Sequence, residues 1–189
     1  MRRSREIIEV IGDVVAEAAT HCTLTVYNSQ GAALEIPCPP INFVFGNAQY
    51  IKDRLDELSL TEAGNEAKLP MIALQCPVNE KRTSADYYTE ARVNILIACS
   101  TRQQWSNEER LTNSFINILR PIYSAFLEAL RADGRIDFGY DERIRHEYSE
   151  NYSYGRYGAY APDGKAVSEP IDAINIANLE LKITKPSCR

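Results

Sequence analysis

The chain has 189 residues and a formal net charge of −5, with 26 acidic against 21 basic side chains. This balance gives no overall basic field for gripping nucleic acid, and the length favours one domain that buries its own core without staples. We therefore expect a single domain over 1–189. Neither a cofactor nor a metal is expected, because the chain contains no motif that binds one. The five cysteines include no CxxC pair. Cys22, Cys76 and Cys99 lie in apolar stretches and are interpreted as small core residues in a reducing compartment.

The N-terminus begins like a signal peptide, with basic residues in Met1–Arg5. Glu6, Glu9, Asp13 and Glu17 interrupt the apolar run that should follow, so a signal peptide is not expected. No stretch approaches the ~18 consecutive apolar residues of a membrane span. These features predict a protein that is made in the cytoplasm and does not enter a membrane.

The first half of the chain alternates between helical and extended patterns. In chain order, the sequence predicts a helix over 4–20, strands over 22–28 and 34–36, a stiff proline-rich crossing over 37–40, and a helix over 47–58. Ser4 is the expected N-cap of the first helix. Gly64 and Asn65 are expected in the loop that follows the second helix.

The second half predicts three strands and one long helix. The strands are expected over 71–76, 87–99 and 171–183, and the helix over 106–131. A polar loop is expected over 77–86, and clean alternation over 87–99 favours a sheet with one covered face. Ser106 and Glu109 have capping-box spacing, and Pro121 predicts a kink in the helix. Two alternating sets in the last strand are out of phase, which predicts a bulge near Ala177–Asn178.

These elements predict an α+β fold in one domain. A small, mostly antiparallel sheet would be packed by the N-terminal helix and by one long kinked helix. A long tyrosine-rich loop or hairpin would precede the last strand, with 138–170 forming an extended arm or insertion.

The chain carries no catalytic signature. It lacks a G-x-S-x-G elbow, a Walker loop and a G-x-G-x-x-G fingerprint. The two histidines, His21 and His146, have no spacing that implies a metal site. Two acidic groups could hold a divalent cation or act as acid and base, but a solvated face and ion pairs are the favoured interpretations. The first group is Asp53, Asp56 and Glu57, and the second is Asp133, Asp137, Asp141 and Glu142, interleaved with Arg131, Arg135, Arg143 and Arg145.

The tyrosine-rich segment 138–170 contains six of the eleven tyrosines, and 145–166 lacks Phe, Leu, Ile and Val. Disordered segments are poor in aromatic residues, whereas tyrosine is enriched at interfaces. We therefore expect an arm or extended hairpin, turning near Pro162–Gly164, that docks on another subunit. A loop folded back on its own domain is the alternative. The residues expected at the intersubunit interface are Arg143, Arg145, Tyr148, Tyr152, Tyr154, Tyr157 and Tyr160.

The arrangement resembles the neck and tail-completion proteins of tailed bacteriophages, the tail-terminator type in particular. The stretches that carry the resemblance are the helix 4–20, "LPMIAL" at 69–74, "EARVNILIAC" at 90–99, the helix 106–131 and "DAINIANLELKI" at 172–183. They match in pattern and element order and contain no diagnostic motif. The prolines at 37–40, the helix at 47–58 and the tyrosine-rich insertion depart from the simplest members.

The resemblance implies a structural subunit of a ring in a phage neck or tail, either a tail terminator or a head-to-tail connector. Its partners would be other copies of itself and adjoining neck or tail proteins, with DNA passing through the central channel. It would be made in the host cytoplasm and located in the virion, with no catalytic residue. Two other hypotheses remain: a non-viral cytosolic protein-binding adaptor, and a metal-dependent enzyme that uses an Asp/Glu cluster.

Overall fold

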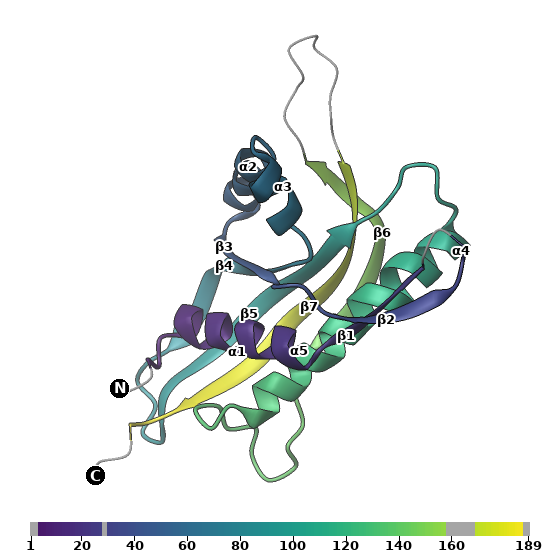
Figure 1. The fold of residues 1–189 in the computed structure, drawn as a ribbon. Coiled ribbons are helices and arrows are strands. Elements are labelled where there is room, and N and C mark those ends of the chain that lie inside the picture. The colour runs from purple at the N-terminus through teal and green to yellow at the C-terminus, as the bar shows by residue number, and fades with distance from the viewer. Residues whose placement is uncertain (1–3, 28–29, 158–168, 187–189) are drawn as a thin grey trace.

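The computed structural model describes residues 4–27, 30–157 and 169–186, with the backbone alone at 153–157 and 169. Helices and strands are mixed along the chain, which confirms the predicted α+β class (Figure 1). The elements are α1 (Ile7–His21), β1 (Thr23–Tyr27), β2 (Ala33–Pro37), β3 (Asn42–Gly46), α2 (Ala48–Leu58), α3 (Glu62–Ala67), β4 (Met71–Lys81), β5 (Tyr87–Ser100), α4 (Asn107–Arg110), η1 (Leu111–Leu119), α5 (Arg120–Ala132), β6 (Glu147–Tyr157) and β7 (Glu169–Thr184).

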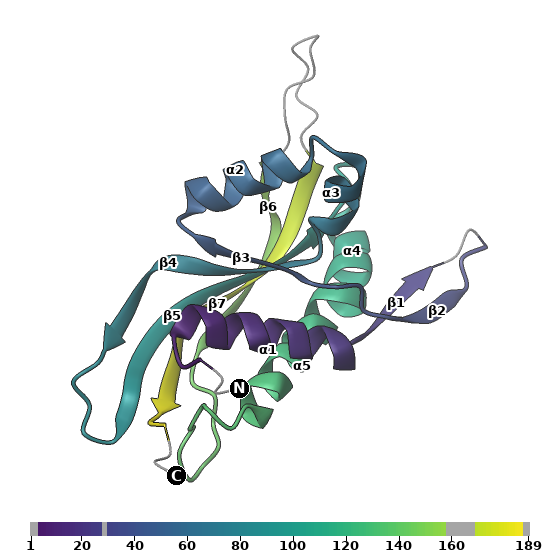
Figure 2. The same ribbon diagram turned by 60° about the vertical axis from the view of Figure 1, so that its left-hand side comes forward.

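Five of the strands form one twisted sheet with the order β3-β4-β5-β7-β6. The pair β3–β4 is parallel and the other three pairs are antiparallel, as expected of a mostly antiparallel sheet. Strands β1 and β2 form a separate two-stranded sheet, called the ribbon below. The ribbon extends away from the five-stranded sheet beyond the end of α1 (Figure 2).

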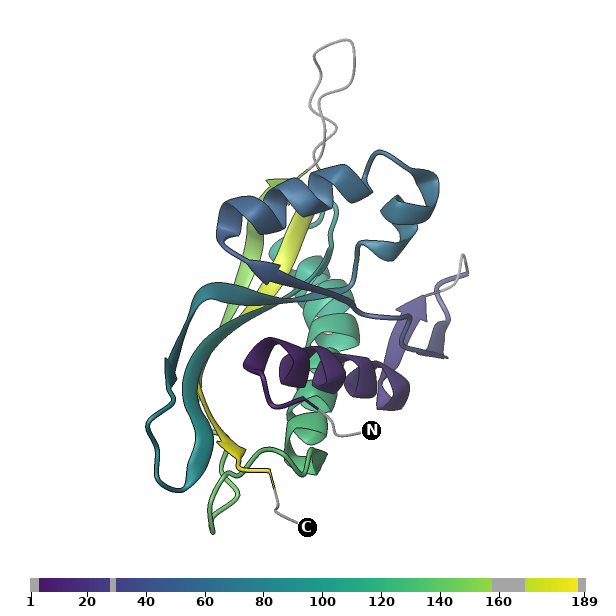
Figure 3. The ribbon, with the colours of Figure 1, turned by 90° about the vertical axis from the view of Figure 1, so that its left-hand side faces the viewer.

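One face of the five-stranded sheet is covered along its length by α1 and by the long helix α4–η1–α5 (Figure 3). The helices bring apolar stripes to this face, because their buried residues recur at helical spacing. Phe115 and Phe126 of the long helix are fully buried in the same core as Ile95 and Ile97 of β5. This core is the main one of the domain.

The other face of the sheet is covered over only part of its length. Ile51 and Leu55 of α2 pack in a second, smaller core with Leu96 and Ala98 of β5. Beyond these residues the same face of β5 is exposed at Asn94 and Arg92. The prediction that β5 has one covered face therefore holds for its first half and is wrong for its second half, where α2 adds a layer.

The long helix changes its winding in the middle. Residues Leu111–Leu119 form a π-helix, and the N–H of Arg120 bonds back to the carbonyl of Phe115. Pro121 then lies in the first turn of α5, where its missing N–H is tolerated. The kink predicted at Pro121 stays a prediction, and the π-helical segment ends two residues before this proline.

The structure confirms several local predictions. The second helix forms at Ala48–Leu58, and Ser106 and Glu109 make the capping box. Val93 pairs with Leu179 while Ile95 pairs with Ile176, so the bulge lies at 177–178 as predicted.

Three other local predictions were wrong, and one strand was not predicted. Helix α1 is N-capped by Glu6 rather than Ser4, and β4 runs through most of the expected polar loop to Lys81. Strand β3 follows the proline crossing, and α3 spans Gly64 and Asn65, for which we expected a loop.

Candidate interface on the edge strand and the open sheet face

Strand β6 brings part of the tyrosine-rich segment to the edge of the sheet. It is the last strand in the sheet order and pairs antiparallel with β7, with Glu147 opposite Ala177 and Asn151 opposite Ala173. The described residues of this segment form a strand that pairs antiparallel with β7 of the same domain. The turn predicted near Pro162–Gly164 lies outside the described residues.

Tyr148 packs on its own domain with one side of its ring. The ring meets Tyr123 of α5 edge-on, with 4.9 Å between centroids, and its hydroxyl donates to Glu150. Burial and the bond to this carboxylate raise the pKa of Tyr148. Tyr148 nevertheless remains 42% exposed.

Tyr152 has a similar environment, but it packs on η1 instead of α5. Its ring centroid lies 4.4 Å from that of the buried Phe115 in η1, and the residue is 36% exposed. Burial raises the pKa of Tyr152. Both tyrosines therefore contact their own helix and still present surface to solvent. Their role between subunits stays a prediction.

An ion pair joins β6 to the long helix between these two tyrosines. Arg120 donates from Nε and Nη2 to the two carboxylate oxygens of Glu150, at 2.7 and 3.1 Å. This fork geometry suits a guanidinium and a carboxylate, and the bond to Arg120 holds the pKa of Glu150 below its usual range. The pair therefore fixes the strand against the helix.

The other predicted interface tyrosines are described less fully. Tyr154 and Tyr157 belong to β6, and Tyr157 pairs through its backbone with Glu169 of β7. Tyr160 lies outside the described residues.

Arg143 and Arg145 lie in the loop that leads to β6. Their guanidinium groups are 3.9 and 3.7 Å from Oδ2 of Asp141, and their side chains are 81% and 69% exposed. Exposed pairs at such distances contribute little stability, so both arginines remain available to a partner. Their predicted intersubunit ion pairs stay a prediction.

The neighbouring arginine in the same acidic and basic stretch is bonded within the chain. Arg135 is buried and donates to Asp133, to Asp13 of α1 and to the Ser4 carbonyl. Asp137 accepts from the hydroxyl of Tyr87. The within-chain ion pairs expected for this stretch are therefore present at Arg135.

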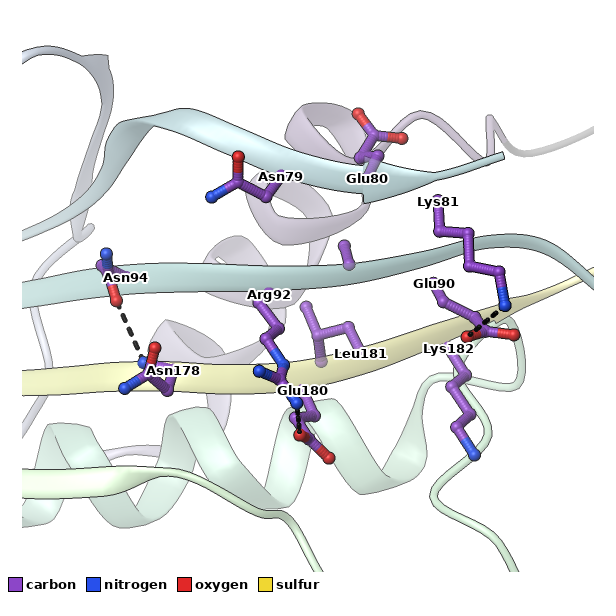
Figure 4. A pocket seen from close by; sticks show the side chains of 11 residues that line it. Asn79, Glu80, Lys81, Glu90, Arg92, Asn94, Asn178, Glu180, Leu181 and Lys182 are labelled. Carbon is purple, nitrogen blue, oxygen red and sulfur yellow. Dashed lines mark hydrogen bonds and ion pairs between the residues drawn. The ribbon is translucent and has the colours of Figure 1, made fainter. Parts of the chain in front are cut away.

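The uncovered part of the sheet forms a polar hollow of about 690 Å³ across β4, β5 and β7 (Figure 4). Asn94 accepts from the N–H of Asn178 at the bulge, and Arg92 pairs with Glu180 at 2.8 Å. Figure 4 shows these side chains on the near side of the strands, with a helix behind them. The residues lining the hollow are Asn79, Glu80, Lys81, Glu90, Ala91, Arg92, Asn94, Asn178, Glu180, Leu181 and Lys182.

The hollow is balanced in charge and contains no histidine or cysteine. Across residues 4–27, 30–157 and 169–186, no group of three or more His, Cys, Asp or Glu side chains could hold a metal ion. The two histidines have separate partners: His21 pairs with Glu17, and His146 bonds to Tyr123 and to the Ile144 carbonyl.

Sequence reasoning did not identify the polar hollow. The signal was present in the alternation of Arg92 and Asn94, and of Glu180 and Lys182, at outward positions of two strands that prove to be neighbours. Their adjacency depends on the strand order, which a single sequence did not reveal.

Comparison with known proteins supplies no family for this chain. No protein-family model matches it, and no curated protein shows significant similarity to it. Within the described part of the chain, no helix has the length and apolar character needed to cross a membrane.

Proposed function

We propose that the chain is a structural subunit of an oligomeric ring in a phage neck or tail, acting as a tail terminator or a head-to-tail connector. Copies would assemble through protein–protein contacts around a DNA channel and reside in the virion. The basis is the order of elements that the resemblance rests on: an N-terminal helix, a small sheet, a long helix across it and a closing strand.

The observation that carries this proposal is the edge position of β6. An eleven-residue edge strand offers a row of backbone donors and acceptors that natural proteins usually cover, shorten or block with charge. Here the edge carries the half-exposed rings of Tyr148 and Tyr152. A strand edge with aromatic side chains suits a partner that adds backbone hydrogen bonds and fills the space beside the rings.

A ring requires a head-to-tail contact, because a contact between identical patches closes after two copies. The β6 edge and the exposed arginines at positions 143 and 145 would form one side of this contact. The other side would lie on a different surface of the next copy.

The adaptor hypothesis uses the same edge with a different occupant. A single partner could supply one strand to β6 without any self-association. Solution mass distinguishes the two, because an adaptor remains a monomer at concentrations where a ring assembles.

Light scattering after size exclusion tests the proposal on the full chain, over a wide range of protein concentration. We expect a closed oligomer for the native chain and a folded monomer for the double variant Tyr148→Lys/Tyr152→Lys, because two inward charges block the edge. The matched control is Tyr140→Lys, which changes a fully exposed tyrosine outside β6 and should leave the oligomer intact.

A second edge variant separates a blocked interface from a damaged fold. Ser149→Lys adds a charge to the same strand at an exposed position, without removing either ring contact on the long helix. It should also reduce the oligomer to monomer while the thermal transition is retained. A native chain that stays monomeric at every concentration would contradict a self-assembling ring and favour the adaptor.

A further inference from the structure

Two cysteines face each other at the base of the ribbon. Cys22 directly precedes β1 and Cys38 directly follows β2, and the register that pairs Thr23 with Pro37 places the two cysteines opposite each other. The N–H of Cys38 donates to the carbonyl of Cys22 at 2.9 Å, which continues the ladder by one step.

This position suits a covalent link between the side chains. Directly opposite residues of an antiparallel pair have Cα atoms about 4.5 to 5.5 Å apart, inside the range that a disulfide spans. Side chains alternate between faces, so both cysteines lie on the same face as Leu24 and Ile36, which join the main core. Each thiol lies near enough to the other to influence its pKa.

We propose that Cys22 and Cys38 are a site of reversible covalent modification, in which a small disulfide such as glutathione disulfide oxidises the pair to an intramolecular disulfide. One thiolate attacks glutathione disulfide, forming a mixed disulfide and releasing one glutathione thiolate. The second protein thiolate attacks the protein sulfur of that mixed disulfide and releases the second glutathione. Two protein thiols are oxidised, one glutathione disulfide is reduced to two glutathiones, and the proton of each protein thiol leaves with a glutathione.

The closed ribbon protects the pair, and its opening admits the oxidant. Cys22 and Cys38 are 5% and 8% exposed, and burial raises the pKa of both thiols, that of Cys38 to about 12. Since the thiolate is the nucleophile, oxidation requires a local opening of the ribbon base. A two-stranded ribbon is marginally stable by itself, so such an opening is expected well below global unfolding.

The bond would fix the base of the ribbon. It would close a short loop of chain and restrict the unfolded state, which stabilises the protein. This inference does not depend on the proposed function, because it holds equally for a ring subunit and for an adaptor.

The test incubates the full reduced chain in glutathione buffers of rising disulfide content, with and without urea below the unfolding transition. Free thiols are then trapped with N-ethylmaleimide in denaturant. Trypsin leaves both cysteines in one peptide, residues 6–52, while Cys76 and Cys99 fall in other peptides. We expect the 6–52 peptide of the oxidised chain to carry no N-ethylmaleimide and to weigh two hydrogens less than the unmodified reduced peptide. Chymotryptic cleavage after Tyr27 should then yield two peptides joined by the disulfide.

Thermal unfolding gives the second readout. Oxidation should raise Tm by about 5–10 °C in the native chain and in the control Cys76→Ser. Cys22→Ser and Cys38→Ser should show no rise. Three outcomes would each overturn the proposal. They are that both adducts persist in glutathione disulfide and urea, that either cysteine bonds to another cysteine, or that Tm is unchanged on oxidation.

Discussion

The outer face of the five-stranded sheet contrasts a covered half with an open half. In the covered half, α2 buries Leu96 and Ala98 of β5. In the open half, Arg92 and Asn94 of the same strand line the polar hollow. The opposite face of β5 packs in the main core over both halves, so the two halves of β5 differ by the layer that α2 adds.

Two charged pairs show a similar difference between buried and exposed surroundings. Arg110 and Asp172 form a buried pair at 2.9 Å at the covered end of β7, with side chains 6% and 0% exposed. Arg92 and Glu180 form a pair at 2.8 Å in the open half, with side chains 68% and 38% exposed. Nearly equal distances therefore carry different energies, because a buried charge loses its water and depends on its partner.

The largest expected effect comes from breaking the buried pair. Arg110→Ala removes bonds to Asp172, Thr101 and the carbonyls of Arg102 and Trp105, and leaves the buried carboxylate without its cation. We expect a loss of about 3–5 kcal/mol in the free energy of unfolding, measured by urea denaturation. The double change Arg110→Met/Asp172→Leu should recover much of this loss. If Arg110→Ala cost less stability than Arg92→Ala, the distinction between the buried and the exposed pair would be contradicted.

Removing apolar contact from the covered half should have the next largest effect. Leu96→Ala opens a cavity between β5 and α2 and should cost about 2–4 kcal/mol in urea denaturation. Leu60→Ala is the matched control, because Leu60 is 71% exposed and its truncation should change stability by less than ~0.5 kcal/mol. If the two variants lost the same free energy of unfolding, Leu96 would not be part of a packed second core.

The pair Arg120–Glu150 lies between these extremes, with side chains 44% and 17% exposed. Arg120 and Tyr148 hold the pKa of Glu150 below its usual value, so the pair contributes stability above the unfolded value of about 4.3. That contribution is lost as the pH falls through the lowered folded value. Glu150→Gln should therefore lower Tm at pH 7 and reduce the acid-dependent part of the Tm profile between about pH 5 and 3. Parallel profiles for the two proteins would show that the pair contributes nothing.

The smallest expected effect is at the exposed pair of the open half. Arg92→Ala should change the free energy of unfolding by less than ~1 kcal/mol, and added salt should reduce even this difference. A loss comparable to that of Arg110→Ala would mean that the hollow is part of the folded core.

The predictable parts of the fold were those with a clear apolar period. The apolar stripe of α1 and the alternation over 87–99 are carried by Ile, Val and Leu, and the phase shift near Ala177–Asn178 correctly predicted a bulge. Strand β3 was missed because the prolines before it suggested an irregular crossing. Strand β6 was not recognised as a strand because its alternation uses Tyr, Ser, Glu and Asn, which also occur in loops.

The site was predictable in residue type and only partly in placement. The enrichment in tyrosine predicted an interface, and that role stays a prediction. The rings of Tyr123 and Phe115 that receive Tyr148 and Tyr152 lie 25 and 37 residues earlier, on the long helix. A helix stripe predicts which residues are buried, and does not predict which strand packs beside them. For the same reason the ion pair of Glu150 with Arg120 could not be assigned from the sequence.

Hydrogen exchange on the full chain, compared between dilute and assembled protein, tests the central claim most directly. If copies assemble through the edge strand, amides in Glu147–Tyr152 should exchange more slowly in the assembled state, while those of the ribbon keep their rates. Slower exchange confined to the ribbon or to the polar hollow, with β6 unchanged, would contradict the account.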